Sequence, residues 1–253
     1  MDIGIVVIAF LAVLVGATLQ RLSGTGVGLV VAPCLALAMG PHVGVFVANS
    51  TTVVSGFLIM FAVLKDVDWR RWGVFAGVGI VGALPGALLV RELSAGWLDV
   101  MIGGVVLVAL VLTFSVPRVP HVTGRRLPVL TAAAGAAGGF LNTASGVAAP
   151  AMVMYSQFTR WPQRDFAATM QPTFMMFGLT SVLMKLFTGA TTVEQLPHAG
   201  LFGAIVLAVI AGIRLGGLLA RRVSAGSARR VAIALAGAGA LSALVRGVLA
   251  LVG

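Results

Sequence analysis

A glycine-rich break interrupts the first long apolar run of this chain. The break reads Gln20-Arg21-Leu22-Ser23-Gly24-Thr25-Gly26-Val27-Gly28, and apolar sequence then continues to Pro33. Three glycines at every second position do not favour a straight helix, because each costs about 1 kcal/mol relative to alanine in a helix interior. They leave room instead for backbone N–H groups to turn toward a ligand.

A related break occurs in the second half of the chain. It reads Asn142-Thr143-Ala144-Ser145-Gly146, and apolar residues follow it up to Pro150. Interrupted hydrophobic segments at corresponding positions of two halves are the sequence feature that best indicates a transporter's binding site. The two breaks therefore predict a ligand site between the halves.

The composition predicts an all-α polytopic membrane protein. Of the 253 residues, 59% are hydrophobic and only 9% are charged, whereas soluble proteins carry about 25% charged residues. The apolar runs do not alternate with polar residues as porin strands do. They predict ten segments, five in each half, at residues 3–20, 25–39, 43–64, 73–90, 98–116, 128–143, 147–158, 164–187, 199–220 and 230–252.

The two halves are related in sequence. Aligning Gly82–Gly96 with Gly212–Gly226, at an offset of 130, gives eight identities in fifteen positions without a gap. We therefore predict a first membrane repeat over 1–117, a cytoplasmic linker over 118–127 and a second repeat over 128–253. Five segments per half is an odd number, so the second half enters the bilayer from the opposite side and the repeat is inverted.

The basic residues support this inversion. The loop around 65–71 contains three of them, whereas its counterpart around 188–198 contains no Lys or Arg. Basic loops stay in the cytoplasm, which predicts that both termini are extracytoplasmic in a bacterial cytoplasmic membrane. The net charge of +10 therefore reflects orientation, and no nucleic-acid partner is expected.

The segments that follow the breaks, 25–39 and 147–158, are too short for the hydrocarbon core. We expect them to be interrupted or re-entrant helices whose N-terminal ends converge and attract an anion. The predicted substrate-binding residues come from the two breaks and from the segment that follows each of them: Ser23, Gly24, Thr25, Gly26, Gly28, Asn142, Thr143, Ser145, Gly146, Asn49, Ser50 and Gln171. The alternative is that the glycines pack helices and the polar groups bond within or between helices.

Four cations lie in or beside the apolar segments. Arg21 and Arg214 are candidate anion contacts, the alternatives being a cytoplasmic-edge charge and a snorkelling side chain, respectively. Lys185 and Arg246 are expected to snorkel from the outer ends of their segments. The carboxylates all lie in loops or at segment ends, and no catalytic, metal-ligand or nucleotide-binding spacing is present. We predict no enzymatic activity, cofactor or metal.

The break regions resemble a known family. Gln20–Pro33, with Gly40-Pro41 and Asn49-Ser50, is similar to the first conserved block of the sulfite exporter TauE/SafE family, and Gly138–Pro150 is similar to the second. The resemblance covers essentially the whole chain and implies transport of small sulfur-containing anions such as sulfite, thiosulfate or organosulfonates. The Gly-Gly pair of both family blocks is absent here, which leaves the substrate open.

The sequence thus predicts a secondary transporter or facilitator that exports a small anion through the bilayer. Two alternatives stay open: a channel or transporter for a cation or neutral metabolite, and a membrane scaffold that transports nothing. Failure of sulfite and sulfonates to compete for transport would favour the first alternative. A partner protein bound without anion flux would favour the second, and the sequence does not decide whether the chain forms a homo-oligomer.

Overall fold

The computed structural model describes residues 3–23, 27–115, 120–220 and 222–252, and these form ten α-helices with two short 3₁₀ turns. Each predicted segment is found as a helix with ends within a few residues of those expected. The helices are α1 (Ile3–Ser23), α2 (Val27–Met39), α3 (Pro41–Val63), α4 (Trp69–Glu92), α5 (Ala95–Ser115), α6 (Arg126–Ser145), α7 (Ala149–Thr159), α8 (Gln163–Thr188), α9 (Ala199–Leu219) and α10 (Ala225–Val252).

The helices form a multi-pass membrane protein, as the composition predicts. Among the described residues, six helices are long and apolar enough to cross a bilayer: α1, α3, α4, α5, α9 and α10. Large apolar side chains on their outer faces are exposed, including Leu11, Val81, Val111, Leu218 and Leu249. Such a surface is suited to lipid contact, because lipid tails are as apolar as these side chains.

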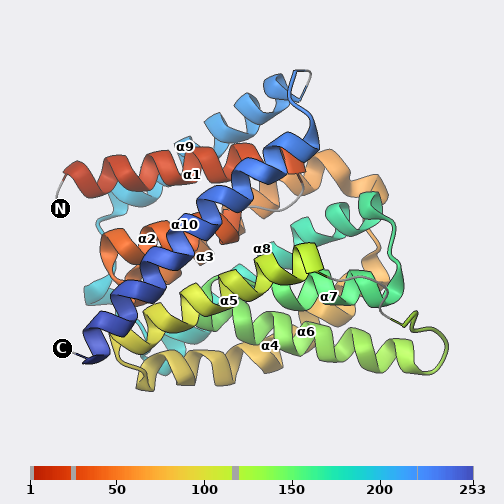
Figure 1. Ribbon diagram of the computed structural model, residues 1–253, viewed down its shortest axis with the longest axis horizontal. Coiled ribbons are helices and arrows are strands. Elements are labelled where there is room, and N and C mark those ends of the chain that lie inside the picture. Colours follow the sequence, from red (N-terminus) through yellow and green to blue (C-terminus); the bar gives the residue numbers. More distant parts are fainter. Residues whose placement is uncertain (1–2, 24–26, 116–119, 221, 253) are drawn as a thin grey trace.

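Helices from the two halves pack against each other throughout the structure. Helix α1 packs on α9, α4 packs on α6, α3 packs on α8, and α5 packs on α10. Figure 1 shows the α1–α9 pair and the α4–α6 pair on opposite sides of the molecule. If the first helix of each half corresponds to that of the other, α1–α9 and α4–α6 are equivalent pairs. An inverted repeat requires this equivalence, and the repeat itself remains a prediction.

The two shorter helices turn back along the helices that precede them. A Cβ atom on Gly16 would lie 3.6 Å from the Cα atom of Val27, so α2 begins beside the middle of α1. The backbone N–H of Val122 donates to the Phe158 carbonyl at 2.8 Å, which places the end of α7 beside the segment leading into α6. With 13 and 11 residues, α2 and α7 are about 20 and 17 Å long. These lengths agree with the expected re-entrant helices.

Glycine permits the turn between α6 and α7. Gly146 follows the last residue of α6 with φ +77°, a left-handed conformation that favours glycine. Pro150 lies in the first turn of α7, where its missing N–H costs no helical hydrogen bond. Elsewhere glycines serve close helix packing: a Cβ on Gly82 or Gly139 would overlap the backbone of the facing helix.

Candidate functional site

The two sequence breaks meet in the interior. A Cβ atom on Gly28, in the first turn of α2, would lie only 2.7 Å from the carbonyl oxygen of Gly146. A Cβ on Gly146 would in turn lie 2.9 Å from the Ala32 Cβ. Since real Cβ atoms do not approach other atoms so closely, the contact depends on glycine at both positions. The breaks are therefore one structural feature, although 118 positions separate them in the chain.

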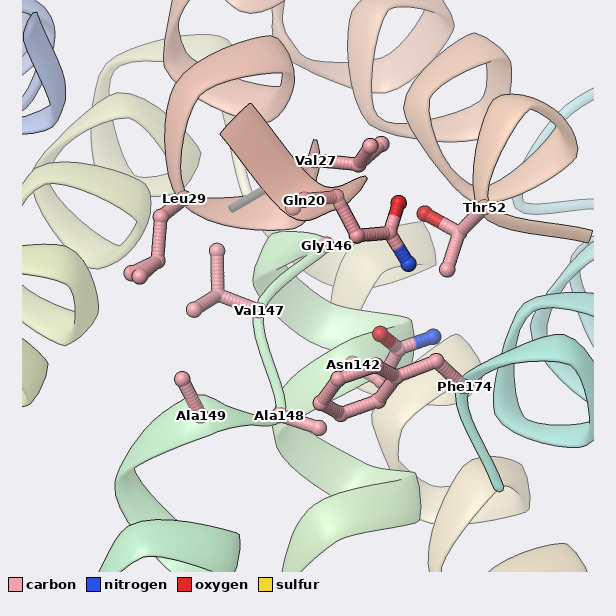
Figure 2. A pocket seen from close by; sticks show the side chains of 11 residues that line it. Gln20, Val27, Leu29, Thr52, Asn142, Gly146, Val147, Ala148, Ala149 and Phe174 are labelled. Atoms are coloured by element: carbon pink, nitrogen blue, oxygen red, sulfur yellow. The ribbon is translucent and has the colours of Figure 1, made fainter. Parts of the chain in front are cut away.

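A small cavity of about 30 Å³ lies at this contact. Figure 2 shows side chains from both halves pointing into it, with Gln20 and Thr52 on one side and Asn142 and Phe174 on the other. Among the described residues, the lining consists of Gln20, Val27, Gly28, Leu29, Thr52, Asn142, Gly146, Val147, Ala148, Ala149 and Phe174. None of these side chains carries a formal charge.

Two helices begin at the wall of this cavity. The lining includes Val27–Leu29, the start of α2, and Ala149, the start of α7. The residue before α7, Ala148, provides no side-chain cap for the helix. A helix start carries about half a positive elementary charge on backbone N–H groups that lack helical partners. The N–H groups at these two helix starts are therefore available as donors to a ligand in the cavity.

Buried amides cross-link the helices behind the cavity. The Asn142 side chain donates to Asn49 Oδ1 at 3.1 Å, and Asn49 Nδ2 donates to the Asn142 carbonyl at 3.3 Å. Asn49 Nδ2 also donates to the Ser181 hydroxyl. All three side chains are buried. The network joins α3, α6 and α8, and only Asn142 of its members lines the cavity.

A second amide pair lies on the other side of the cavity. Gln20 Nε2 donates to Gln171 Oε1 at 2.8 Å, and both side chains are 2% exposed. Gln20 Oε1 is buried without a hydrogen-bond partner. Both glutamines also line a larger, open cavity of about 420 Å³, with Arg21, Asp66 and Arg164 further out on its wall. We call this cavity the vestibule; the Gln20–Gln171 pair lies between it and the central cavity.

The predicted site residues differ in where they lie. Gly28, Asn142 and Gly146 line the cavity, and Asn49 and Gln171 bond to residues that do. Gly24, Thr25, Gly26 and the side chain of Ser23 lie outside the described residues. The hydroxyls of two further predicted residues bond within their own helices: Ser50 donates to the Phe46 carbonyl and Ser145 to the Leu141 carbonyl. The hydroxyl of Thr143 is buried and has no hydrogen-bond partner among the described residues.

Three polar residues of this region were not predicted. Gln20 and Thr52 line the cavity, and Ser181 completes the amide network. Both cavity residues could have been found from the sequence, because they lie close to predicted residues. Gln20 belongs to the first break, and Thr52 follows Asn49 by three positions. Ser181 had a weaker signal, a pair of hydroxyl residues with Thr180 in an otherwise apolar stretch.

The cations lie apart from the cavity. Arg21 is exposed at the vestibule, and Arg214 is exposed on α9. The expectation that Lys185 snorkels is wrong, because its side chain is fully buried. Snorkelling is wrong for Arg246 too, because its guanidinium bonds inward to both Asp99 carboxylate oxygens, at 2.7 and 2.8 Å. It also donates to the carbonyls of Ala36 and Leu37.

These features define the class of protein. It is a multi-pass helical membrane protein in which two helix starts and the polar side chains of Gln20, Thr52 and Asn142 line one central cavity, an arrangement typical of transporters. Residues 8–243 match the model of the family described as Sulfite exporter TauE/SafE, and the chain belongs to this family of membrane transporters. The resemblance seen in the two glycine-rich blocks is thereby confirmed. No curated protein and no solved structure gives a significant match.

Proposed function

We propose that this protein is a secondary transporter or facilitator that exports a small anion, sulfite or an organosulfur anion, across the cytoplasmic membrane. The observation that carries the proposal is the contact between Gly28 and Gly146, which brings the starts of α2 and α7 to one cavity. Membership of the sulfite exporter TauE/SafE family supports the substrate class.

The cavity chemistry favours an anion over a cation. Backbone N–H groups at helix starts and the amides of Gln20 and Asn142 can replace water around an oxyanion. A site for a divalent cation typically includes carboxylates, and the described residues of the cavity lining include none. A neutral site that relies on dipoles also releases its ligand more readily than a site with a fixed ion pair would.

The membrane potential is sufficient to drive export. An inside-negative potential assists the exit of a monovalent anion by about 2.3 kcal/mol per 100 mV. A uniport mechanism therefore needs no coupling ion. The basic loops predict that the vestibule faces the cytoplasm and that both termini lie outside.

Alternating access would come from movement of the two helix hairpins, α1–α2 and α6–α7. The Gln20–Gln171 hydrogen bond closes the central cavity toward the vestibule, and breaking it would admit an anion. The packing of α1 on α9 and of α4 on α6 is the pairing that an inverted repeat produces, and in such a transporter one hairpin moves against the rest of the structure.

The test is transport by purified protein in liposomes under an imposed potential. Sulfite, thiosulfate and an alkyl sulfonate should be transported or should compete with one another, whereas acetate should not compete. The rate should rise as the potential becomes more negative on the side that contains the anion. Movement of a cation or neutral solute instead would overturn the proposal, and so would binding of a protein partner with no flux of any solute.

A further inference from the structure

A lysine is buried beyond the amide network, and its side-chain nitrogen has no hydrogen-bond partner among the described residues. The side chain of Lys185, near the end of α8, is 0% exposed, and its Nζ atom makes no hydrogen bond. An isolated buried charge is strongly unfavourable unless something compensates it. The structure therefore contains a basic group whose charged form has no counter-ion among the described residues in this conformation.

The position of Lys185 connects it to the central cavity. Lys185 follows Ser181 by four residues, so the two lie on the same face of α8, about 6 Å apart along its axis. Ser181 accepts from Asn49, which bonds to the cavity residue Asn142. A line of polar groups thus runs from the cavity through this network toward Lys185. The vestibule lies at the beginning of α8 and Lys185 near its end, so this line leads away from the vestibule.

The nearby charged groups do not neutralise Lys185. Asp99 is within electrostatic range of His42, as Lys185 is, but its two carboxylate oxygens are bound by Arg246. The His42 ring hydrogen-bonds to the backbone of Val90. Among the described residues, no carboxylate forms an ion pair with Lys185.

Two hydroxyl groups of this region are also buried without partners. One belongs to Thr191, whose backbone N–H donates to the Lys185 carbonyl at 3.2 Å. The other belongs to Thr143, which directly follows Asn142. Unpaired buried hydroxyls are uncommon in proteins. Together with the Lys185 ammonium group, they are donors of the kind that binds an oxyanion.

We propose that Lys185, assisted by the hydroxyl of Thr191, forms a second anion-binding site on the side of the central cavity away from the vestibule. This inference rests on the proposed function, because the ligand is the transported anion. An apolar cluster of Val90, Leu98, Ala144 and Ala190 includes the neighbours in sequence of Thr143 and Thr191. The proposed site accepts an anion in the conformation that opens away from the vestibule, where the bound anion compensates the charge of Lys185.

The test compares Lys185→Met with Lys65→Met, which removes an exposed lysine from the 3₁₀ turn after α3. Sulfite flux is measured in liposomes, and thermal unfolding is measured with and without sulfite. We expect Lys185→Met to lower the flux by about tenfold or more. The variant should unfold at the wild-type temperature or above, since it removes an uncompensated charge, and sulfite should stabilise it less than it stabilises the wild type. Lys65→Met should match the wild type.

A second variant, Thr191→Val, keeps the shape of the side chain and removes only its hydroxyl. It should raise the half-saturating sulfite concentration while leaving the maximal rate nearly unchanged. If the wild type transports sulfite and both variants equal it in flux and in stabilisation, the second site is disproved and the proposed function stands. If the wild type transports no anion, the proposed function fails and the second site fails with it.

Discussion

Gly28 and Gly146 touch: a Cβ atom on the first would lie 2.7 Å from the carbonyl oxygen of the second. This contact joins the start of α2 to the end of α6, so it fixes one hairpin against the other. Any side chain at Gly28 must push the hairpins apart, and that property makes the contact testable.

Substituting Gly28 with alanine should reduce transport strongly. The added methyl group meets backbone, which cannot rotate away as a side chain can, and a displacement of about 1 Å at a functional site can lower a rate by about a hundredfold. Sulfite flux in liposomes is the measurement, normalised to the amount of folded protein. Gly77→Ala is the control, because nothing lies within 4 Å of a Cβ there; wild-type flux in Gly28→Ala would contradict the role of the contact.

A negative charge on the cavity wall should block an anion. Asn142→Asp places a carboxylate beside the helix starts, whereas Asn142→Leu removes the same bond to Asn49 Oδ1 without adding charge. We expect anion flux in the Asp variant to be lower than in the Leu variant by about tenfold or more. Equal fluxes in the two variants, or a faster Asp variant, would favour a cation or neutral substrate.

Locking the Gln20–Gln171 pair should stop transport reversibly. In a Cys34→Ala background, Gln20→Cys and Gln171→Cys can be joined by a short bifunctional thiol reagent, because their side chains meet in the structure. Crosslinking should abolish the flux of an alkyl sulfonate, which unlike sulfite does not cleave disulfides, and a reducing agent that cleaves the linker should restore it. The reagent should leave each single-cysteine variant active. Full flux in the crosslinked protein would show that the pair does not gate the cavity.

The Arg246–Asp99 pair should be important for stability. Arg246→Met leaves Asp99, which is 3% exposed, buried without a counter-ion, and breaking a buried pair in this way costs about 3 kcal/mol. The free energy of unfolding in detergent should fall by about 3 kcal/mol. It should recover in the double variant Arg246→Met/Asp99→Asn. Arg91→Met, which breaks an exposed pair with Glu92, should change stability by less than about 1 kcal/mol.

The predicted orientation can be tested by labelling. Cysteines placed at the exposed residues Arg70 and Arg229 should react with an impermeant maleimide only from the cytoplasmic side. A cysteine at the exposed Glu194 should react only from outside. These experiments also require the Cys34→Ala background. Labelling of positions 70 and 229 from opposite faces would contradict the inverted arrangement of the halves.

The membrane class, the helices and the two breaks could be read from the sequence because each depends on local properties. Apolar runs mark segments whose backbone must bond internally in lipid, and clustered glycines and Pro150 mark where a helix stops and restarts. The family resemblance rests on the same short blocks. Asn49 and Gln171 were also predicted, since an amide in an apolar segment is costly without a partner.

The tertiary structure decided which groups meet. Gln20 bonds to Gln171 across 151 positions and Asn142 to Asn49 across 93, pairings that arise only when helices from both halves pack together. Burial of Lys185 and the inward pairing of Arg246 are decided in the same way, because a snorkelling cation and a buried one have the same local sequence. Hydropathy and glycine content determine where helices form and break, which depends on a few neighbouring residues. Which buried side chains become hydrogen-bond or ion-pair partners depends on the packing of the whole chain.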